Sequence, residues 1–233
     1  MLADADLAAV GRTLGDAHRA RFVLALLGGQ ELAAGELAAR AAISSSLASA
    51  HLAKLLESRL VSVRQHGRQR YYRLASPEIA QAVEALLTLA PQAAASGLTE
   101  VTRGKALRRA RTCYDHLAGQ LGVALADAFE QDKIVTTAES GWALTEGGQR
   151  RLSLLGLDAE ALGRGTLHPG RRPLLRPCPD WTERRPHLAG VLGQALASRL
   201  LELDWVRRTP SSRALLITPL GERQLLAEFA VRV

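Results

Sequence analysis

Two pairs of cysteine and histidine, one near the middle of the chain and one farther towards the C-terminus, have the residue types and spacing that suit metal coordination. Cys113 and His116 are three positions apart, and Cys178 is followed closely by His187. Residues three positions apart on a helix share a face, so a helix would point Cys113 and His116 the same way. Two thiolates and two imidazoles would satisfy a tetrahedral zinc ion or another thiophilic metal. The spacing is not that of a known zinc finger, so such a site forms only if the fold brings both pairs together.

The same segments fit three other interpretations, which the sequence leaves open. Cys113 could be a small buried hydrophobic residue, with both histidines hydrogen bonded at helix starts. The cysteines could instead form a thiol switch. A third interpretation is a pocket for an anionic organic effector, built from aromatic and charged residues that could equally form a surface ion-pair cluster. These residues are Asp180, Trp181, Glu183, Arg184 and Arg185.

An internal repeat contains Cys113 and both histidines. The sequence HLAG at 116–119, with Leu-Gly at 121–122 and Ala-Leu at 124–125, recurs 71 positions later, at 187–190, 192–193 and 195–196. Farther along, Leu-Thr at 144–145 and glycine 148 match Ile-Thr at 217–218 and glycine 221, at an offset of 73. The repeat would bring His187 into the position equivalent to His116. We therefore expect a pseudo-repeat of two helix-hairpin-helix units, at about 113–155 and 184–230, packed as one domain with a sensing or dimer-stabilising role.

Other patterns place the elements around the repeat. Alternating residues predict strands at 134–137 and 142–145 in the first unit, and at 205–208 and 214–218 in the second. Residues 163–179 are rich in Gly, Pro and Arg, which predicts that the segment is largely a loop. A basic helix at 103–111 is either a solvated or dimer-bridging segment or a phosphate contact.

A helix followed by a basic hairpin occupies residues 44–74. Ser44 suits a helix N-cap, and Ala48, Leu52, Leu55 and Leu56 recur at the spacing of one apolar helical face. Strands at 60–64 and 70–74 flank a turn at 66–68, and the span from 59 to 73 holds five arginines and no acid. Short or cationic side chains would let this helix enter a major groove, and the hairpin would reach phosphates or a minor groove. The candidate DNA contacts are Ser44, Ser45, Ser46, Ser49, Ala50, His51 and Lys54 on the helix, and Arg64, His66, Arg68, Gln69 and Arg70 on the hairpin.

Together with a short helix and tight turn at 35–43, this unit resembles the ArsR/SmtB family of winged-helix transcriptional regulators. The resemblance covers about residues 5–90 and rests on LGDAHR at 14–19, ELA at 36–38, SAHL at 49–52 and GRQRYYRL at 67–74. It implies a homodimer in which the first helix and a helix near 77–89 pack across a two-fold axis, and hence a palindromic DNA operator. Ala50 stands where the family often has glutamine, which removes a base-edge contact and shifts specificity towards the wing and DNA shape.

The metal sites common in that family lack their ligands in this sequence. Residues 31–40 contain no cysteine, and residues 77–89 contain neither cysteine nor histidine. An effector would therefore have to act through the C-terminal half of the chain.

Composition and charge agree with two domains and an anionic partner. The chain has 233 residues, of which 47% are hydrophobic, with a net charge of +7. Residues 1–95 hold 10 Lys and Arg against 8 Asp and Glu, so positive charge in this part must be concentrated on the hairpin. We expect a mainly α-helical protein with small β-hairpins: a winged helix-turn-helix DNA-binding and dimerisation domain at 1–92, and the duplicated domain at 98–233.

The sequence also narrows the function classes. The first residues lack the features of a secretory signal and no segment is long enough to cross a membrane, so a cytoplasmic location is expected. Gly-rich phosphate loops, nucleophile elbows and metalloprotease motifs are absent, which argues against an enzyme. We predict a bacterial ArsR-type regulator that binds operator DNA as a repressor and is controlled by metal, redox or a small ligand. The alternatives are a cysteine enzyme resembling organomercurial lyase and a non-specific, structural DNA-binding protein.

Overall fold

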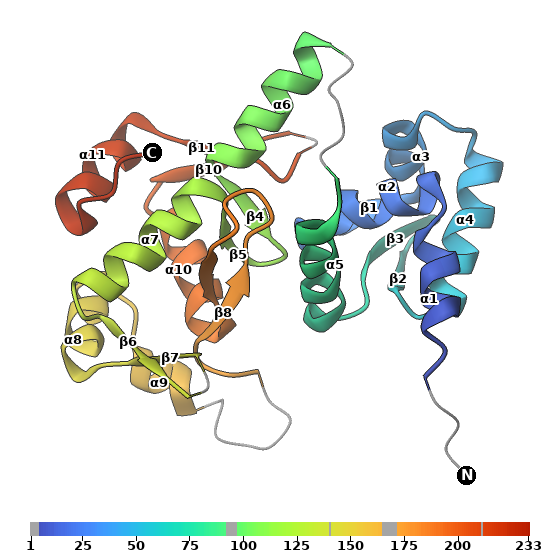
Figure 1. Cartoon of the computed structure of the whole chain (residues 1–233). Helices are drawn as coiled ribbons and strands as arrows, with labels where there is room; N and C mark the ends of the chain where they lie inside the picture. The colour runs from blue at the N-terminus through green and yellow to red at the C-terminus, as the bar shows by residue number, and fades with distance from the viewer. Residues whose placement is uncertain (1–4, 92–96, 140, 165–171, 211) are drawn as a thin grey trace. The chain divides into compact units, whose positions relative to one another are not determined.

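The computed structural model describes residues 5–91, 97–139, 141–164, 172–210 and 212–233. Its elements fall into two compact units, Met1–Ala82 and Val83–Val233 (Figure 1). The division lies inside a helix, α5, which contributes residues to both units. A domain boundary at 92–98, part of which lies outside the described residues, stays a prediction.

The N-terminal unit is a winged helix-turn-helix. Asp6, Asp16 and Ser44 begin three of its helices by accepting hydrogen bonds from backbone N–H groups of the first turn. Ala42, in the left-handed conformation, ends the supporting helix and makes the tight turn before Ser44. In chain order the elements are α1 (Leu7–Leu14), α2 (Ala17–Leu26), β1 (Leu32–Ala33), α3 (Ala34–Ala41), α4 (Ser45–Glu57), β2 (Val61–His66), β3 (Gln69–Leu74) and α5 (Pro77–Leu89).

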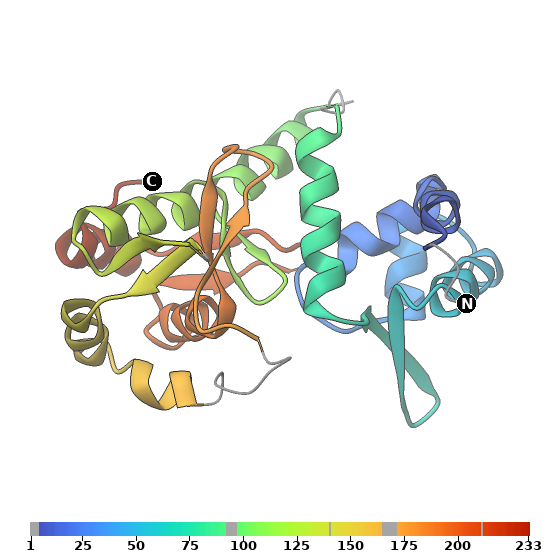
Figure 2. The same ribbon diagram turned by 60° about the horizontal axis from the view of Figure 1, so that its bottom comes forward.

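The wing is the antiparallel ribbon of β2 and β3. Its register pairs Val61 with Leu74 at the base and His66 with Gln69 at the tip, where Gly67 has a φ of 58°. The short β1 pairs with the other edge of β3, so the sheet order is β1-β3-β2. Figure 2 shows the β2–β3 ribbon extending beyond the helices of this unit. The predicted N-cap at Ser44 and the hairpin are therefore confirmed.

The C-terminal unit contains the same order of elements twice. A short hairpin leads into a long helix, and a second hairpin leads into another helix. After α6 (Leu98–Arg109), the first set is β4 (Arg111–Cys113), β5 (His116–Ala118), α7 (Gly119–Gln131), β6 (Val135–Ala138), β7 (Gly141–Leu144) and α8 (Glu146–Leu154). The second set, after α9 (Ala159–Arg164), is β8 (Arg176–Pro179), β9 (Pro186–Ala189), α10 (Gly190–Glu202), β10 (Val206–Arg208), β11 (Leu215–Ile217) and α11 (Pro219–Phe229).

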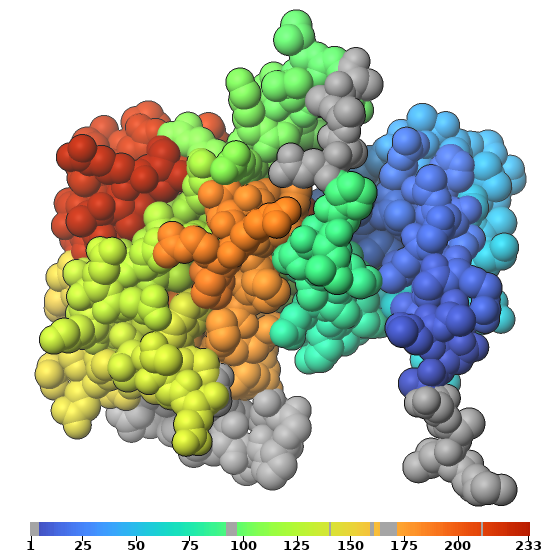
Figure 3. Space-filling view, viewed as in Figure 1, coloured from blue at the N-terminus to red at the C-terminus, as the bar shows by residue number. Residues whose placement is uncertain are grey.

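These two sets exchange packing partners. Strand β9 of the second set packs against α7 of the first, while β5 of the first packs against α10 of the second. In Figure 3 the orange segment that contains β8 and β9 lies against the yellow-green α7. One hydrophobic core joins both sets and includes Leu121, Phe129, Leu192 and Leu200, which are all fully buried. The first hairpins of the two sets therefore meet in the middle of this unit.

Two local predictions for this unit were wrong. Cys113 and His116 do not lie on a helix, because residues 111–118 form the β4–β5 hairpin. The segment 163–179 is not simply a loop, since α9 extends to Arg164 and residues 176–179 form β8; residues 165–171 lie outside the described part. The other hairpins occur where alternation predicted them, as β6–β7 and β10–β11.

Among the described residues, no helix combines the length and the apolar character needed to cross a membrane.

Candidate metal centre and DNA-binding surface

The turns of two hairpins position the cysteines and histidines. Cys113 and His116 are a cross-strand pair that closes a two-residue turn, in which Tyr114 has a φ of 60°. Cys178 and His187 are likewise a cross-strand pair, between β8 and β9. Side chains of directly opposed residues lie on the same face of a ribbon, so each hairpin presents one thiol beside one imidazole.

The four ligand atoms of Cys113, His116, Cys178 and His187 lie within 4.8 Å of one another. The two Sγ atoms are 3.9 Å apart, and the two Nε2 atoms are 3.2 Å apart. Zinc bonds of about 2.3 Å to sulfur and about 2.0–2.1 Å to nitrogen imply, at tetrahedral angles, S···S and N···N separations of about 3.8 Å and about 3.3 Å. Both observed separations match this geometry. We call these four residues the Cys2His2 cluster.

The cluster is sealed from solvent. Each of its four residues is at most 2% exposed. Two glycines face these histidines, because a Cβ on Gly122 would lie 3.4 Å from the Cβ of His187, and one on Gly193 the same distance from the Cβ of His116. Each of these added atoms would also lie 2.6 Å from a backbone carbonyl oxygen. The helices α7 and α10 thus require glycine here because of the close backbone carbonyl oxygens, and the histidine of the other set packs at the same positions.

A carboxylate lies behind each histidine. Nδ1 of His116 is 3.1 Å from Oδ1 of Asp115, and Nδ1 of His187 is 3.2 Å from Oδ2 of Asp180. The second contact has ion-pair distance without good hydrogen-bond alignment. A carboxylate at Nδ1 holds the ring so that Nε2 faces the metal, as in most protein metal sites. Each aspartate stands two positions after a cysteine, a regularity of the repeat that could have identified both; only Asp180 was singled out, as an effector contact.

Both aspartates are held ionised. Burial opposes ionisation of Asp115, but hydrogen bonds from Arg172 and His116 outweigh it and lower the pKa of Asp115 to about 2. Burial also opposes ionisation of Asp180, and the contacts with His187 and Arg111 hold its pKa well below the ordinary range. The pKa of His187 is raised, because the Asp180 carboxylate outweighs the effect of burial.

The thiol of Cys113 is a poor nucleophile. The hydrogen bond with Cys178, together with burial, raises the pKa of Cys113 to about 12. Oxidants react with thiolates, and reactive cysteines are partly exposed with lowered pKa values. A bound divalent metal would instead favour the thiolates, because thiols deprotonate when they coordinate. The surroundings of Cys113 thus suit a metal ligand better than a thiol switch or a catalytic nucleophile.

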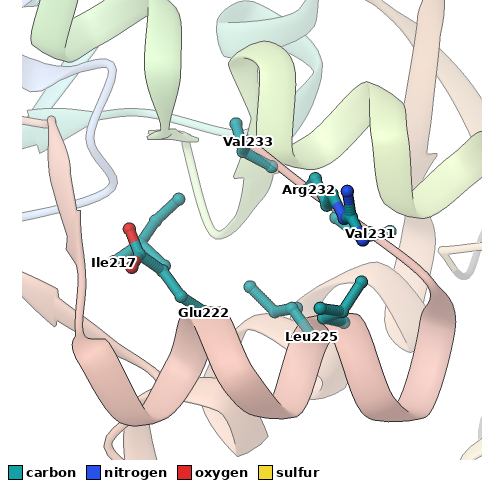
Figure 4. Close-up of a pocket in the computed structure, with 7 residues that line it drawn as sticks. Ile217, Glu222, Leu225, Val231, Arg232 and Val233 are labelled. Atoms are coloured by element: carbon teal, nitrogen blue, oxygen red, sulfur yellow. The ribbon is translucent and has the colours of Figure 1, made fainter.

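The residues suggested for an organic effector do not line one pocket. Asp180, Arg184 and Arg185 border a cavity of about 490 Å³, while Trp181 and Arg184 border another of about 460 Å³. Asp180 is fully buried in ion pairs, and Arg185 pairs with Asp127 on the surface. A third cavity, of about 280 Å³, lies between α11 and the C-terminal residues (Figure 4). None of the Cys2His2 residues lines any of these three cavities.

Most candidate DNA contacts on α4 are accessible. Ala48, Leu52 and Leu55 are buried beneath the helix, whereas Ser44, Ser45, Ser46, Ser49, Ala50 and Lys54 are exposed. The Ser49 hydroxyl donates to the Ser45 carbonyl, which leaves its oxygen free to accept. His51 departs from this arrangement: its side chain is 12% exposed, and Nδ1 lies 3.4 Å from Asp16. His51 therefore packs against α2 instead of facing outwards with the serines.

The wing carries less free charge than the sequence suggested. All five predicted hairpin residues, Arg64, His66, Arg68, Gln69 and Arg70, are exposed. However, Arg64 donates to Glu31 at 2.6 Å and 3.1 Å, and Arg73 lies 3.9 Å from the same carboxylate. Glu31 is distant in the sequence and had no predicted role. Arg68 and Arg70 form no ion pair within the described part of the chain, which makes them the better phosphate contacts.

Comparisons with known proteins agree with this description. A family model described as a helix-turn-helix domain matches residues 14–64. The uncharacterized HTH-type transcriptional regulator YdfF of Bacillus subtilis is 42% identical over 217 residues, which cover 93% of this chain and 94% of YdfF.

Solved structures match over little more than a third of the chain. The transcriptional repressor BigR from Xylella fastidiosa is 33% identical and covers 38% of this chain and 89% of its own, with a TM-score of 0.35. The cadmium metal-sensor CmtR from Mycobacterium tuberculosis is 35% identical and covers 39% and 94%, with a TM-score of 0.33.

Proposed function

Because the chain belongs to the helix-turn-helix transcriptional regulators, we propose that it is a zinc-responsive regulator of the ArsR type, in which the C-terminal unit carries the metal. It binds a palindromic operator as a homodimer and acts as a repressor. The matching separations within the Cys2His2 cluster are the observation that carries the metal assignment. Two thiolates and two neutral imidazoles would also balance the charge of Zn²⁺ in a buried site.

We further propose that the C-terminal unit is a duplicated helix-hairpin-helix domain. Residues equivalent in the sequence repeat occupy equivalent elements, as with Thr145 and Thr218, which each cap the helix that follows a second hairpin. Gly122 and Gly193 each face the histidine of the other copy. The metal site therefore takes one Cys-His pair from each copy.

For DNA binding, the exposed face of α4 supports entry into a major groove, and the wing supports phosphate contact. Exposed serines present hydroxyl groups that can read base edges, whereas arginines at the wing tip supply charge without sequence information. Replacing Ser49 by alanine should change base preference, measured by selection from a random DNA library, with little change in the salt dependence of binding. An unchanged preference would contradict the placement of α4 in the groove.

The metal assignment is tested with the full-length reduced protein. We expect one zinc per chain by elemental analysis, and substitution by Co²⁺ should give the visible absorption of a tetrahedral thiolate site. Cys178→Ser and His187→Gln should each abolish stoichiometric zinc. His66→Gln, which alters an exposed histidine of the wing, is the matched control and should keep it.

The regulatory assignment needs a second measurement. Operator affinity of the zinc-loaded and zinc-free wild-type protein should differ by about tenfold or more, since coupling between two sites typically spans about 5–150-fold. Zinc-free wild-type protein after purification and reconstitution would refute the metal site. Equal operator affinity with and without zinc would leave a structural metal site and refute its role as a sensor.

A further inference from the structure

A chain of buried charged residues leads away from the Cys2His2 cluster. Asp180, which contacts His187, also accepts a hydrogen bond from NH2 of Arg111 at 2.9 Å and one from the backbone of Gly119 at 2.7 Å. Arg111 and Asp180 are both fully buried. A buried guanidinium is costly unless its partners hold it, so this contact is a fixed part of the interior.

Arg111 has a second carboxylate within reach. The same NH2 atom that donates to Asp180 lies 3.9 Å from Oε2 of Glu84, which is also fully buried. Oε1 of Glu84 is held by Arg213, whereas Oε2 has no hydrogen-bond partner among the described residues. Buried carboxylate oxygens nearly always have a hydrogen-bond partner, and Arg111 is the nearby cation that could become one for Oε2 of Glu84.

Glu84 lies on α5, and α5 is joined directly to the wing. Strand β3 ends at Leu74 and α5 begins at Pro77, so only two residues separate the wing from the helix. A change in the position or stability of α5 therefore acts on the element that carries Arg68 and Arg70.

From this geometry we propose that Glu84, Arg111 and Asp180 form a relay that transmits metal occupancy from His187 to α5. This proposal rests on the proposed metal site and specifies how that site regulates DNA binding. A metal on Nε2 fixes the His187 ring and draws the Asp180 carboxylate towards Nδ1, because ligating histidines donate Nδ1–H to a carboxylate. Asp180 then holds Arg111 less firmly, and Arg111 closes on the unpaired oxygen of Glu84. The two carboxylates thus compete for one guanidinium, and the metal decides which prevails.

The remaining contacts of Arg111 allow this exchange. Its NH1 donates to the Thr182 hydroxyl and to the Leu107 carbonyl, at 3.0 Å and 3.3 Å, and its guanidinium carbon lies 5.1 Å from the centre of the Trp181 ring. None of these contacts uses NH2. The guanidinium can therefore change carboxylate partners by a small rotation while its other contacts persist.

Glu84→Gln tests the relay without touching a metal ligand. The amide keeps the shape of the side chain and can still accept a hydrogen bond from Arg213. It carries no negative charge, so it no longer attracts the Arg111 guanidinium. We expect one zinc per chain and an unchanged Co²⁺ spectrum, with the ratio of zinc-loaded to zinc-free operator affinity falling from about tenfold to within about twofold. Glu222→Gln breaks the surface pair with Arg109 and is the matched control, which should retain the wild-type ratio.

The coupling between zinc binding and operator binding is reciprocal, which provides a second measurement. A merely structural role of Glu84 would leave this measurement unchanged. If zinc changes operator affinity by a given factor, operator DNA must change zinc affinity by the same factor. In Glu84→Gln this effect of DNA on zinc affinity should disappear.

A measurement on the wild-type protein covers the case in which Glu84→Gln does not fold. Hydrogen exchange of the α5 amides should change when zinc is added, since α5 gains or loses the contact with Arg111. Unchanged exchange in α5, or a wild-type affinity ratio in folded Glu84→Gln, would overturn the relay alone. Absence of zinc from the wild-type protein would overturn the metal site, and the relay with it.

Discussion

Nε2 of His116 lies 3.2 Å from Nε2 of His187, although 71 positions of the chain separate the two residues. Two imidazole nitrogens can share one hydrogen bond at this distance, or both can bind one metal ion. The adjacent thiols, 3.9 Å apart, and the aspartates behind both rings favour the metal.

Removing the metal should destabilise the C-terminal unit. A ligand at about 1,000 times its dissociation constant stabilises the folded state by about 4 kcal/mol, which corresponds to roughly 10 °C in Tm for a unit of this size. We expect a chelator to lower the Tm of the wild-type protein by that amount in scanning calorimetry. His116→Gln should have the lower Tm from the start and show no response to chelator. A chelator effect of equal size in that variant would contradict the prediction.

Asp115→Asn should weaken the metal site without abolishing it. The amide cannot hold the His116 ring as the carboxylate does, and loss of such a supporting group typically lowers metal affinity by about 10–100-fold. Competition with a chromophoric chelator measures the change, with zinc still at one per chain when in excess. Asp127→Asn, which breaks only the surface pair with Arg185, should bind zinc like the wild type. Equal affinities for the two variants would mean that Asp115 has no role in the site.

Gly122→Ala should destabilise the C-terminal unit. Its Cβ would lie 2.6 Å from the Leu117 carbonyl oxygen, so backbone must move, and overpacking of this kind costs about 1–3 kcal/mol. Gly147→Ala, on α8, meets nothing closer than 3.8 Å and should stabilise by about 0.5–1 kcal/mol. Urea unfolding followed by circular dichroism measures both. A neutral Gly122→Ala would show that α7 does not approach the backbone of β5 as closely as described.

Replacing arginines at the wing tip should reduce the salt dependence of DNA binding. Each lost phosphate contact lowers the slope of log affinity against log salt by about 1, so Arg68→Ala and Arg70→Ala should each show this reduction on any sequence. Arg150→Ala, an equally exposed arginine on α8, is the control and should leave the slope unchanged. A normal slope in both wing variants would place the DNA elsewhere.

Glu31→Gln should have the opposite effect. It frees Arg64 and removes a negative charge beside the wing, so operator affinity and the salt slope should both increase. Fluorescence anisotropy with labelled operator at several salt concentrations measures both quantities. Weaker binding by this variant would mean that Glu31 positions Arg64 for contact instead of competing for it.

The DNA-binding unit was largely predictable because its signals are local. Ser44 was predicted to cap a helix and does so in the structure. The arginine-rich alternating segment around Gly67 was likewise predicted to be a hairpin and forms one. The Cys2His2 residues were identified by type, but their local structure was predicted wrongly. A spacing of three positions, as between Cys113 and His116, fits one face of a helix and also the pair that closes a two-residue hairpin turn. Periodicity alone does not separate these.

Buried ion pairs were beyond the reach of the sequence. Arg111 was predicted to end a basic helix that is solvated, bridges a dimer or contacts phosphate, yet it is fully buried between residues from distant segments. Glu84 belongs to a segment with an amphipathic helical pattern, and this pattern does not indicate that Arg213 is its ion-pair partner. Charges held by long-range partners look like surface residues until the fold is known, because their stabilisation comes from groups that sequence patterns do not connect.

The pairing of thiols from two hairpins also has a consequence for the unfolded chain. A metal bound by Cys113 and Cys178 ties together segments 65 residues apart. Cross-links that close long loops reduce the conformational entropy mainly of the unfolded ensemble. This loss of entropy grows slowly with loop length. If metal remains bound during denaturation, the loaded protein would unfold into a looped chain, which can recover its two hairpins without an extensive search. Metal loading would then speed refolding as well as stabilise the fold.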